Sequence, residues 1–259
     1  MSNQQRTMKA NNNSLVITSL PIPYQSGLIC TWDFFFYDDA RKYHILDWLK
    51  ANGCNAIVVL LENLDPNNRF TIFKDKFGGK IDRAKRDMVV SWAKTIHDNG
   101  GIFVPCIHSD ANSAIVKAYN QHMTAMSIYG DMLEPFVDGW IFALEGNETQ
   151  MFTREEQEGA VNYLRDSVTD KPVGSHGRWN DRCPRNVDFW ALEMPWSPLE
   201  GDSHSSLEVV NYTKNSIEKA KVPMWVLEDC WNPVEQVCRD HAQAVSGVPM
   251  VVGVGAPIS

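Results

Sequence analysis

Two glutamates in this chain each close an apolar run of strand-like length. Glu148 ends the run that begins at Gly139, and Glu228 ends the run that begins at Val222, about 80 residues further along. A carboxyl group at the C-terminal end of a buried parallel strand lies where water is scarce, so its pKa can rise while that of a neighbouring carboxyl stays low. Two such groups on one cleft could serve as proton donor and nucleophile, the pair that cleavage of a glycosidic bond requires.

Further carboxylate, imidazole and indole side chains follow the ends of the other apolar runs. This mixture suits a sugar, because carboxylates and imidazoles bond hydroxyl groups and flat indole faces cover the C–H faces of pyranose rings. It suits phosphate poorly, because few Lys or Arg residues accompany it. The residues that we expect to bind substrate are Asn147, Trp32, His108, His176, Trp179, Glu193, Trp196 and Trp231.

Each of these positions also has a purely structural interpretation. For Glu62, Asp110 and Glu193 taken singly, a solvated loop residue or an ion-pair partner is favoured by about two to one; for Glu148 and Glu228 the odds are reversed. His108 and His176 could be metal ligands, but no His-x-His pattern follows the first expected strand, so we predict no metal and no cofactor. Four histidines fall on expected helices and are predicted to lie on the surface: His44, His97, His122 and His241.

The elements that must position these residues alternate along the chain. Short continuous apolar runs, typical of strands buried on both faces, are separated by amphipathic segments. Eight strands are expected, at Leu28–Thr31, Ala56–Leu61, Ile102–Ile107, Gly139–Leu144, Pro172–Ser175, Phe189–Leu192, Met224–Leu227 and Met250–Val254.

Helices are expected between most of these strands, and their ends are well marked. Thr153 followed by Glu156 has capping-box spacing, and Asn-Gly pairs at Asn52 and Asn99 are C-terminal signals. In the first helix, Tyr43, Leu46, Trp48 and Leu49 are expected to face inward. The expected helices are Asp38–Asn52, Asp82–Asn99, Asn112–Tyr129, Thr153–Val168, Ser205–Lys221 and Pro233–Ser246.

Eight strand–helix units in 259 residues predict an α/β fold, a single (β/α)8 TIM barrel. The segment His176–Val187 has no helical period, so the fifth connection is expected to be irregular. The last helix is expected to be short or absent, because the chain ends at Ser259 directly after the eighth strand; whether it is truncated there is left open. Residues 1–14 are predicted to be a disordered N-terminal segment and residues 15–259 the catalytic barrel.

Composition narrows the set of partners. The formal net charge is -8 and no Lys/Arg stripe occurs, which argues against nucleic acid. No apolar run approaches the length of a membrane span, and the first residues lack the apolar stretch of a signal peptide. We therefore expect no membrane partner and a cytoplasmic location by default, with an extracellular or virion-associated location and the oligomeric state left open. The six cysteines form no CxxC pair, which favours buried reduced thiols.

Two segments carry a family resemblance. The end of Leu144–Glu148 resembles the Gly-Asn-Glu end of strand four in clan A glycoside hydrolases, and Pro223–Glu228 is similar to the strand-seven motif of that clan. The resemblance implies a retaining TIM-barrel glycosidase in which Asn147 bonds the sugar 2-hydroxyl. Glu148 would then be the general acid/base and Glu228 the nucleophile.

The chain also departs from the clan's pattern. The segment Val251–Pro257 has no tryptophan where the eighth strand of the clan often ends near one, and Glu145 precedes Gly146 as an additional acid. It stays open whether Glu145 rather than Glu148 is the proton donor. The leading hypothesis is a retaining glycoside hydrolase that acts on an oligo- or polysaccharide; the alternatives are a non-catalytic carbohydrate-binding barrel and, ranked last, a metal-dependent barrel hydrolase.

Overall fold

Parallel strands form one closed sheet in the computed structural model, which describes residues 28–31, 34–51, 56–62, 70–75, 78–108, 119–142, 153–178, 183–193, 215, 222, 224–228 and 251–253. The hydrogen-bonded order is β7-β6-β5-β4-β3-β2-β1-β8. β7 and β8 also contact each other, so the sheet closes on itself and the predicted TIM barrel is confirmed. The strands are β1 Leu28–Thr31, β2 Ala56–Glu62, β3 Ile102–His108, β4 Trp140–Ile141, β5 Val173–Arg178, β6 Phe189–Glu193, β7 Met224–Glu228 and β8 Val251–Gly253.

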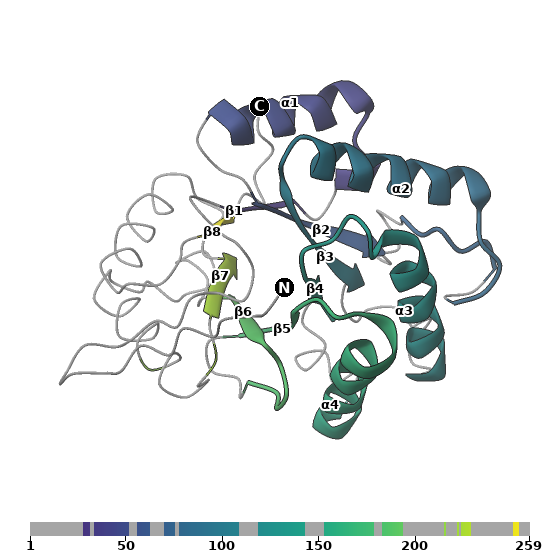
Figure 1. Cartoon of the computed structure of the whole chain (residues 1–259), viewed down its shortest axis with the longest axis vertical. Coiled ribbons are helices and arrows are strands. Elements are labelled where there is room, and N and C mark those ends of the chain that lie inside the picture. Colours follow the sequence, from purple (N-terminus) through teal and green to yellow (C-terminus); the bar gives the residue numbers. More distant parts are fainter. Residues whose placement is uncertain are drawn as a thin grey trace, which may run out of the picture.

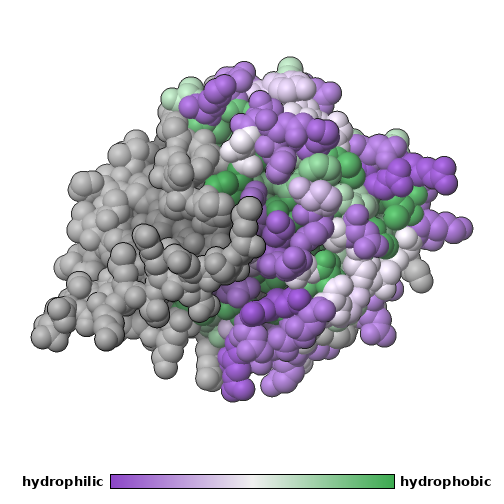
Figure 2. All heavy atoms as spheres, viewed as in Figure 1, coloured by the Kyte–Doolittle hydropathy of each residue, from purple (hydrophilic) through white to green (hydrophobic). Residues whose placement is uncertain are grey.

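Helices cover the outer face of the strands, and in Figure 1 they form an arc around β1 to β5. The connection between β5 and β6 has no helix at residues 183–188, as the irregular sequence there predicts. Figure 2 shows mainly hydrophilic residues on the outer surface of α1 and α4, as expected for helices that bury their apolar side. The helical elements are η1 Phe34–Phe36, α1 Asp39–Ala51, α2 Arg83–Asp98, α3 Tyr119–Leu133, α4 Arg154–Tyr163 and the π-helical turn η2 Leu164–Val168.

The apolar strand β2 shows why this chain forms a barrel. Its residues Ile57, Val59 and Leu61 pack with the helices in one hydrophobic cluster, while Val58 and Leu60 are equally buried on the opposite face. A strand buried on both faces needs helices outside and a packed interior inside. Trp140 of β4 and Trp190 of β6 are also fully buried.

The predicted starts of α2 and α4 are confirmed, whereas the helix expected to end at Tyr129 continues to Leu133 in α3. Asp82 caps α2 by accepting hydrogen bonds from the backbone N–H groups of Ala84 and Lys85. Thr153 and Glu156 form the complete capping box of α4. Gly100 follows α2 with a φ of 75°, a left-handed conformation that glycine adopts without steric cost.

Two predictions about helix faces are wrong. Tyr43 is 53% exposed, and Lys42 is buried in its place, with Nζ 3.5 Å from Asp39 and 5.1 Å from the centre of the Trp92 ring. Burial of the alkyl stem of Lys42 beneath a paired ammonium escapes a rule that counts apolar residues. His122 is 0% exposed rather than on the surface, because it shares the buried face of α3 with Tyr129. His44 and His97 are exposed, as predicted.

Two aspartates form hydrogen bonds with the backbone where strands start, at the N-terminal end of the barrel, which we call the floor. Asp138 Oδ2 accepts from the backbone N–H of Phe103 at 2.9 Å, and the N–H of Asp138 donates to the Phe103 carbonyl at 2.9 Å. Asp188 repeats this arrangement with Val173, at 2.9 Å and 2.8 Å. These paired bonds satisfy backbone groups where the ladder between strands begins.

Some predictions fall outside the described residues. They are the disorder of residues 1–14, the last residues of the strand Gly139–Leu144, the helix Pro233–Ser246 with His241, and most of Ser205–Lys221, of which Asn215 is described and helical. The fifth strand was expected to stop at Ser175. It continues to Arg178, because its pairing with β6 continues as far as Glu193.

Candidate functional site

The C-terminal ends of the strands, which we call the mouth, bring charged residue types together. Arg178, Glu193 and Glu228 end β5, β6 and β7, three neighbours in the sheet. In the register of the sheet, Arg178 is opposite Glu193, and Glu193 is opposite Glu228. In parallel-barrel enzymes the reacting groups come from this end of the strands.

An irregularity in the pairing of β6 with β7 sets the alignment of Glu193 with Glu228. Leu192 of β6 is opposite Val226, but the next residue, Glu193, is opposite Glu228, because the register shifts at this point. Without the shift, Leu227 would lie level with Glu193. Strand irregularities of this kind are common beside active sites, where they change which residue type reaches a given place.

The two expected catalytic glutamates are described to different extents. The structure describes the backbone of Glu228 at the mouth, whereas Glu148 and its neighbour Asn147 lie outside the described residues. The four expected indole platforms also lie outside them: Trp32, Trp179, Trp196 and Trp231. The assignment of catalytic and substrate-binding residues therefore stays a prediction.

Two histidines expected to bind substrate lie on β3 and β5, strands that β4 separates in the sheet. His108 ends β3 and is in register with Glu62 at the end of β2. His176 lies within β5, not in the loop after it, and is 2% exposed. His176 is therefore a buried residue two positions before the end of β5, not an exposed loop residue.

Glu62 is the most unusual group that the structure describes at the mouth. It is the last residue of β2 and is 0% exposed. Its Oε1 accepts hydrogen bonds from the backbone N–H of Ile72 at 3.1 Å and from the hydroxyl of Tyr129. Burial raises the pKa of Glu62 to about 7, although hydrogen bonds from Thr71, Tyr129 and Ile72 oppose the shift.

The sequence-based interpretation of Glu62 as solvated or ion-paired is wrong about its surroundings. The ammonium of Lys85 only weakly lowers the pKa of Glu62, and Glu62 forms no direct ion pair with another described residue. The partner Tyr129 comes from α3, far away in sequence, and burial together with the Glu62 charge raises its pKa well above the usual value. No local motif announces a contact between residues 67 positions apart.

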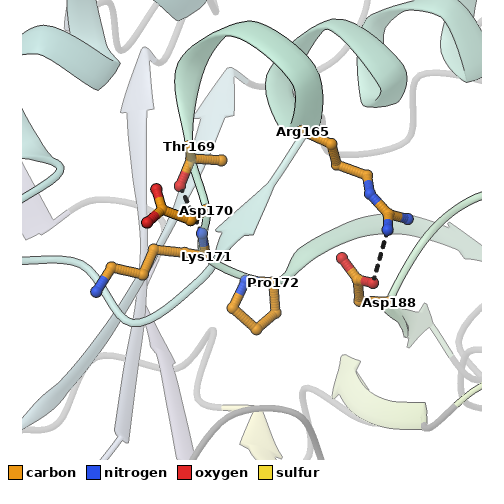
Figure 3. Close-up of a pocket in the computed structure, with 6 residues that line it drawn as sticks. All are labelled: Arg165, Thr169, Asp170, Lys171, Pro172 and Asp188. Atoms are coloured by element: carbon orange, nitrogen blue, oxygen red, sulfur yellow. Dashed lines mark hydrogen bonds and ion pairs between the residues drawn. The ribbon is translucent and has the colours of Figure 1, made fainter. Parts of the chain in front are cut away.

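One pocket in the described part of the chain lies on the floor, away from the mouth. It has a volume of about 260 Å³ and is lined by Arg165, Thr169, Asp170, Lys171, Pro172 and Asp188. Figure 3 shows the Arg165 guanidinium reaching toward Asp188, 3.4 Å away. Charges of both signs line this pocket, and the acidic pair expected for glycoside chemistry is not part of it.

Within the described residues, no group of three or more His, Cys, Asp or Glu side chains could hold a metal ion. Among the described residues, Cys106 and Cys183 are free thiols. Burial raises the pKa of Cys183 to about 12. In the part of the chain that is described, no helix has the length and apolar character that crossing a membrane requires.

No family model matches this sequence, and neither does any curated protein. Solved structures do match. A family 1 β-glucosidase from Thermotoga maritima aligns with a TM-score of 0.63 at 9% identity, over 82% of this chain and 76% of the other. A GH113 β-1,4-mannanase aligns with a TM-score of 0.58 at 11% identity, over 89% and 87% of the two chains.

A third similar structure is the endo-1,4-β-mannanase from Rhizomucor miehei, with a TM-score of 0.62 at 10% identity, over 88% of this chain and 85% of that one. At these identities the likeness concerns the fold, and a shared fold does not by itself establish an activity. The chain thus has the TIM-barrel fold of the clan A glycoside hydrolases, as the two glutamate segments predict.

Proposed function

We propose that this protein is a retaining glycoside hydrolase in which Glu228 is the nucleophile and Glu148 the general acid/base. The observation that carries the proposal is the position of Glu228 at the mouth, at the end of β7, in a barrel with the fold of glycosidases. The ionised Glu228 would attack the anomeric carbon while Glu148 protonates the departing oxygen. Glu148 would then deprotonate the water that releases the sugar.

Asn147 would hold the 2-hydroxyl of the sugar at the scissile bond, and the tryptophans that follow strand ends would provide ring platforms. The fold neighbours are named for β-glucoside and β-1,4-mannan hydrolysis, so β-linked hexosides and their oligomers are the first substrates to test. Like-charge proximity should raise the pKa of the acid, which predicts a bell-shaped pH profile that belongs to the coupled pair.

The decisive experiment measures release of sugar from aryl β-glycosides and from a panel of polysaccharides. Wild-type protein is compared with Glu228→Gln, Glu148→Gln and Glu145→Gln. We expect release by wild type, near-complete loss in the first two variants and retained activity in the third. Loss in Glu145→Gln with activity kept in Glu148→Gln would move the acid to Glu145, and activity in both Glu148→Gln and Glu228→Gln would overturn the assignment.

Proton NMR of the first product gives the stereochemistry. Retention of the anomeric configuration is expected, which corresponds to carboxyl groups roughly 5–5.5 Å apart, whereas inversion would correspond to about 6.5–9.5 Å. Glycan binding without release would instead indicate a non-catalytic carbohydrate-binding barrel. Loss of activity on chelation, restored by zinc or manganese, would indicate a metal-dependent hydrolase.

A further inference from the structure

A buried carboxyl group without a catalytic assignment lies at the mouth. Glu62 is fully buried, and a carboxyl there is costly unless its oxygens are hydrogen-bonded. An apolar side chain of similar volume at the end of β2 would avoid this cost. The donors to Glu62 come from different elements: the backbone of Ile72 and the side chain of Thr71 after β2, and the side chain of Tyr129 in α3.

Ile72 belongs to a short ordered segment of the mouth, residues 70–75 and 78–82, which we call the rim segment. It follows β2 and leads into α2, so it lies on the same side of the barrel as the expected site. Phe73 and Ile81 form an antiparallel bridge, the Lys74 N–H donates to the Lys80 carbonyl at 2.8 Å, and the Asp82 N–H donates to the Ile72 carbonyl at 2.7 Å.

The rim segment also packs on the element that follows β1. The ring of Phe70 stacks on Phe35 of η1, with centres 5.4 Å apart and planes 20° apart, and meets Phe36 edge-on at 5.8 Å. The ring of Phe73 meets Tyr129 edge-on at 6.2 Å. Glu62 is therefore the polar anchor of an aromatic layer that connects the β1 and β2 sides of the mouth with α3.

We propose that Glu62 is a positioning residue that holds the rim segment in place through Ile72 and Tyr129, so that this side of the mouth is preformed for sugar binding. The role in sugar binding rests on the proposed function. The anchoring of the rim segment by Glu62 does not depend on it. Active-site geometry depends on such supporting contacts, and a misplacement of about 1 Å can cost about 100-fold in rate.

The groups that face Glu62 are compatible with an anchor. Lys85 of α2 donates to the carbonyl of Thr71 at 3.1 Å, so its charge is held near the rim segment without pairing with Glu62. Tyr129 is the titratable partner from α3, and His108 of β3 is the neighbour in register. The hydrogen bonds from Ile72 and Tyr129 reach the same oxygen of Glu62, an acceptor that a glutamine amide can reproduce and a leucine cannot.

The test compares Glu62→Leu with Glu62→Gln at pH 8, using two measurements. Hydrogen exchange at the Ile72 amide reports the anchor directly; we expect at least about tenfold faster exchange in Glu62→Leu and less than about threefold change in Glu62→Gln. Steady-state kinetics on an aryl β-glycoside should show a rise of about tenfold in KM for Glu62→Leu with kcat nearly unchanged, and recovery of KM in Glu62→Gln.

Glu134→Leu is the matched control. Glu134 is also a hydrogen-bonded glutamate, accepting from Trp140 Nε1 at 3.3 Å and from the Thr169 hydroxyl at 2.8 Å, but it lies near the floor. Its loss should leave KM and Ile72 exchange unchanged. If Glu62→Leu does not fold, Tyr129→Phe replaces it, and exchange at Ile72 should then be about threefold faster. The control for this variant is Tyr163→Phe, which loses a different hydroxyl contact, the one with Ser127.

Unchanged exchange at Ile72 in Glu62→Leu, or in Tyr129→Phe where that variant replaces it, overturns the inference whatever the activity. Faster exchange with an unchanged KM overturns the role in sugar binding and leaves the proposed hydrolase intact. A wild-type protein that releases no sugar fails the proposed function. In that case the Kd of an oligosaccharide is measured instead. A higher Kd in Glu62→Leu that returns to the wild-type value in Glu62→Gln supports the positioning role. An unchanged Kd, or no binding at all, overturns it.

Discussion

The mouth and the floor of this barrel use carboxylates in opposite ways. On the floor, Asp138 and Asp188 each exchange two hydrogen bonds with the backbone of a preceding strand. At the mouth, Glu62 is sealed from water, and burial raises its pKa to about 7. The row of strand ends there also places Glu193 beside Glu228.

The difference follows from the direction of parallel strands. Backbone N–H groups are left over where strands begin, and aspartate oxygens satisfy them at low cost. Where strands end, the chain enters loops that can cover a carboxyl and change its protonation. An acidic residue in a parallel barrel should therefore be interpreted by the end of the strand to which it belongs.

The largest expected contrast concerns activity. Glu228→Gln at the mouth, and Glu148→Gln in the proposed partner of Glu228, should each lower kcat by at least about 10²–10⁴, the range that a positioned proton donor usually contributes. Asp138→Asn on the floor should leave kcat within about twofold. Initial rates on an aryl β-glycoside check both, and equal losses at the two ends would remove the functional distinction between them.

The second contrast concerns pH and stability. Because the pKa of Glu62 rises from 4.5 in the unfolded chain to about 7 in the folded protein, its contribution to stability is greatest below pH 4.5 and falls as the pH rises to 7. The loss amounts to about 3 kcal/mol at most. Glu62→Gln does not titrate, so its stability relative to wild type should increase over this interval.

Urea unfolding between pH 4 and 8 measures this difference, and Asp188→Asn is the floor control. Parallel profiles for wild type and Glu62→Gln would show that burial does not perturb Glu62 in solution. The comparison of the two ends would then lose its electrostatic basis.

A third, smaller effect belongs to the floor. Asp188→Ala should lower the free energy of unfolding by about 1–3 kcal/mol, because the Val173 N–H loses a charge-assisted acceptor and Arg165 loses its ion-pair partner. Urea denaturation at pH 7 gives the value, and kcat is expected to stay unchanged. A large loss of activity in a variant that remains folded would contradict a purely structural floor.

The smallest expected effect is at the start of the helix α4, apart from the strand ends that the comparison concerns. Thr153→Ala removes the side-chain oxygen that accepts from the Glu156 N–H at 3.2 Å and should cost about 1 kcal/mol. Thr153→Ser keeps the oxygen and should restore most of it. A melting temperature that fails to distinguish these two variants would show that the capping box contributes nothing measurable.

Much of the barrel could be predicted from local patterns. All eight strands lie where short apolar runs occur, and the capping residues Asp82 and Thr153 begin helices as expected. These features depend on neighbours in sequence, whose chemistry is visible in one dimension. The exposed Tyr43 and the buried Lys42 differ from the prediction because their surroundings, including Trp92 of α2, come from another element.

The site was predictable in its strand ends but not in its supporting contacts. The end of β7 at Glu228 follows from the apolar run before it. The environment of Glu62 does not follow from sequence, because Tyr129 is brought to it by the packing of α3 and Ile72 by the folding of the rim segment. The repeated bonding of Asp138 and Asp188 is also not apparent from the sequence, although each precedes an apolar run by one or two residues.

The one-residue offset in β7 has a practical consequence for engineering. The alignment of Glu193 with Glu228 depends on an uneven count of residues between two adjacent strands. An insertion of one residue between Val226 and Leu227 that keeps the one-residue offset would place Leu227, in place of an acid, opposite Glu193 while leaving overall hydrophobicity nearly unchanged. Loop grafts and chimaeras that join this barrel to another should therefore be spliced outside Met224–Glu228, since a junction within it could silence the protein without unfolding it.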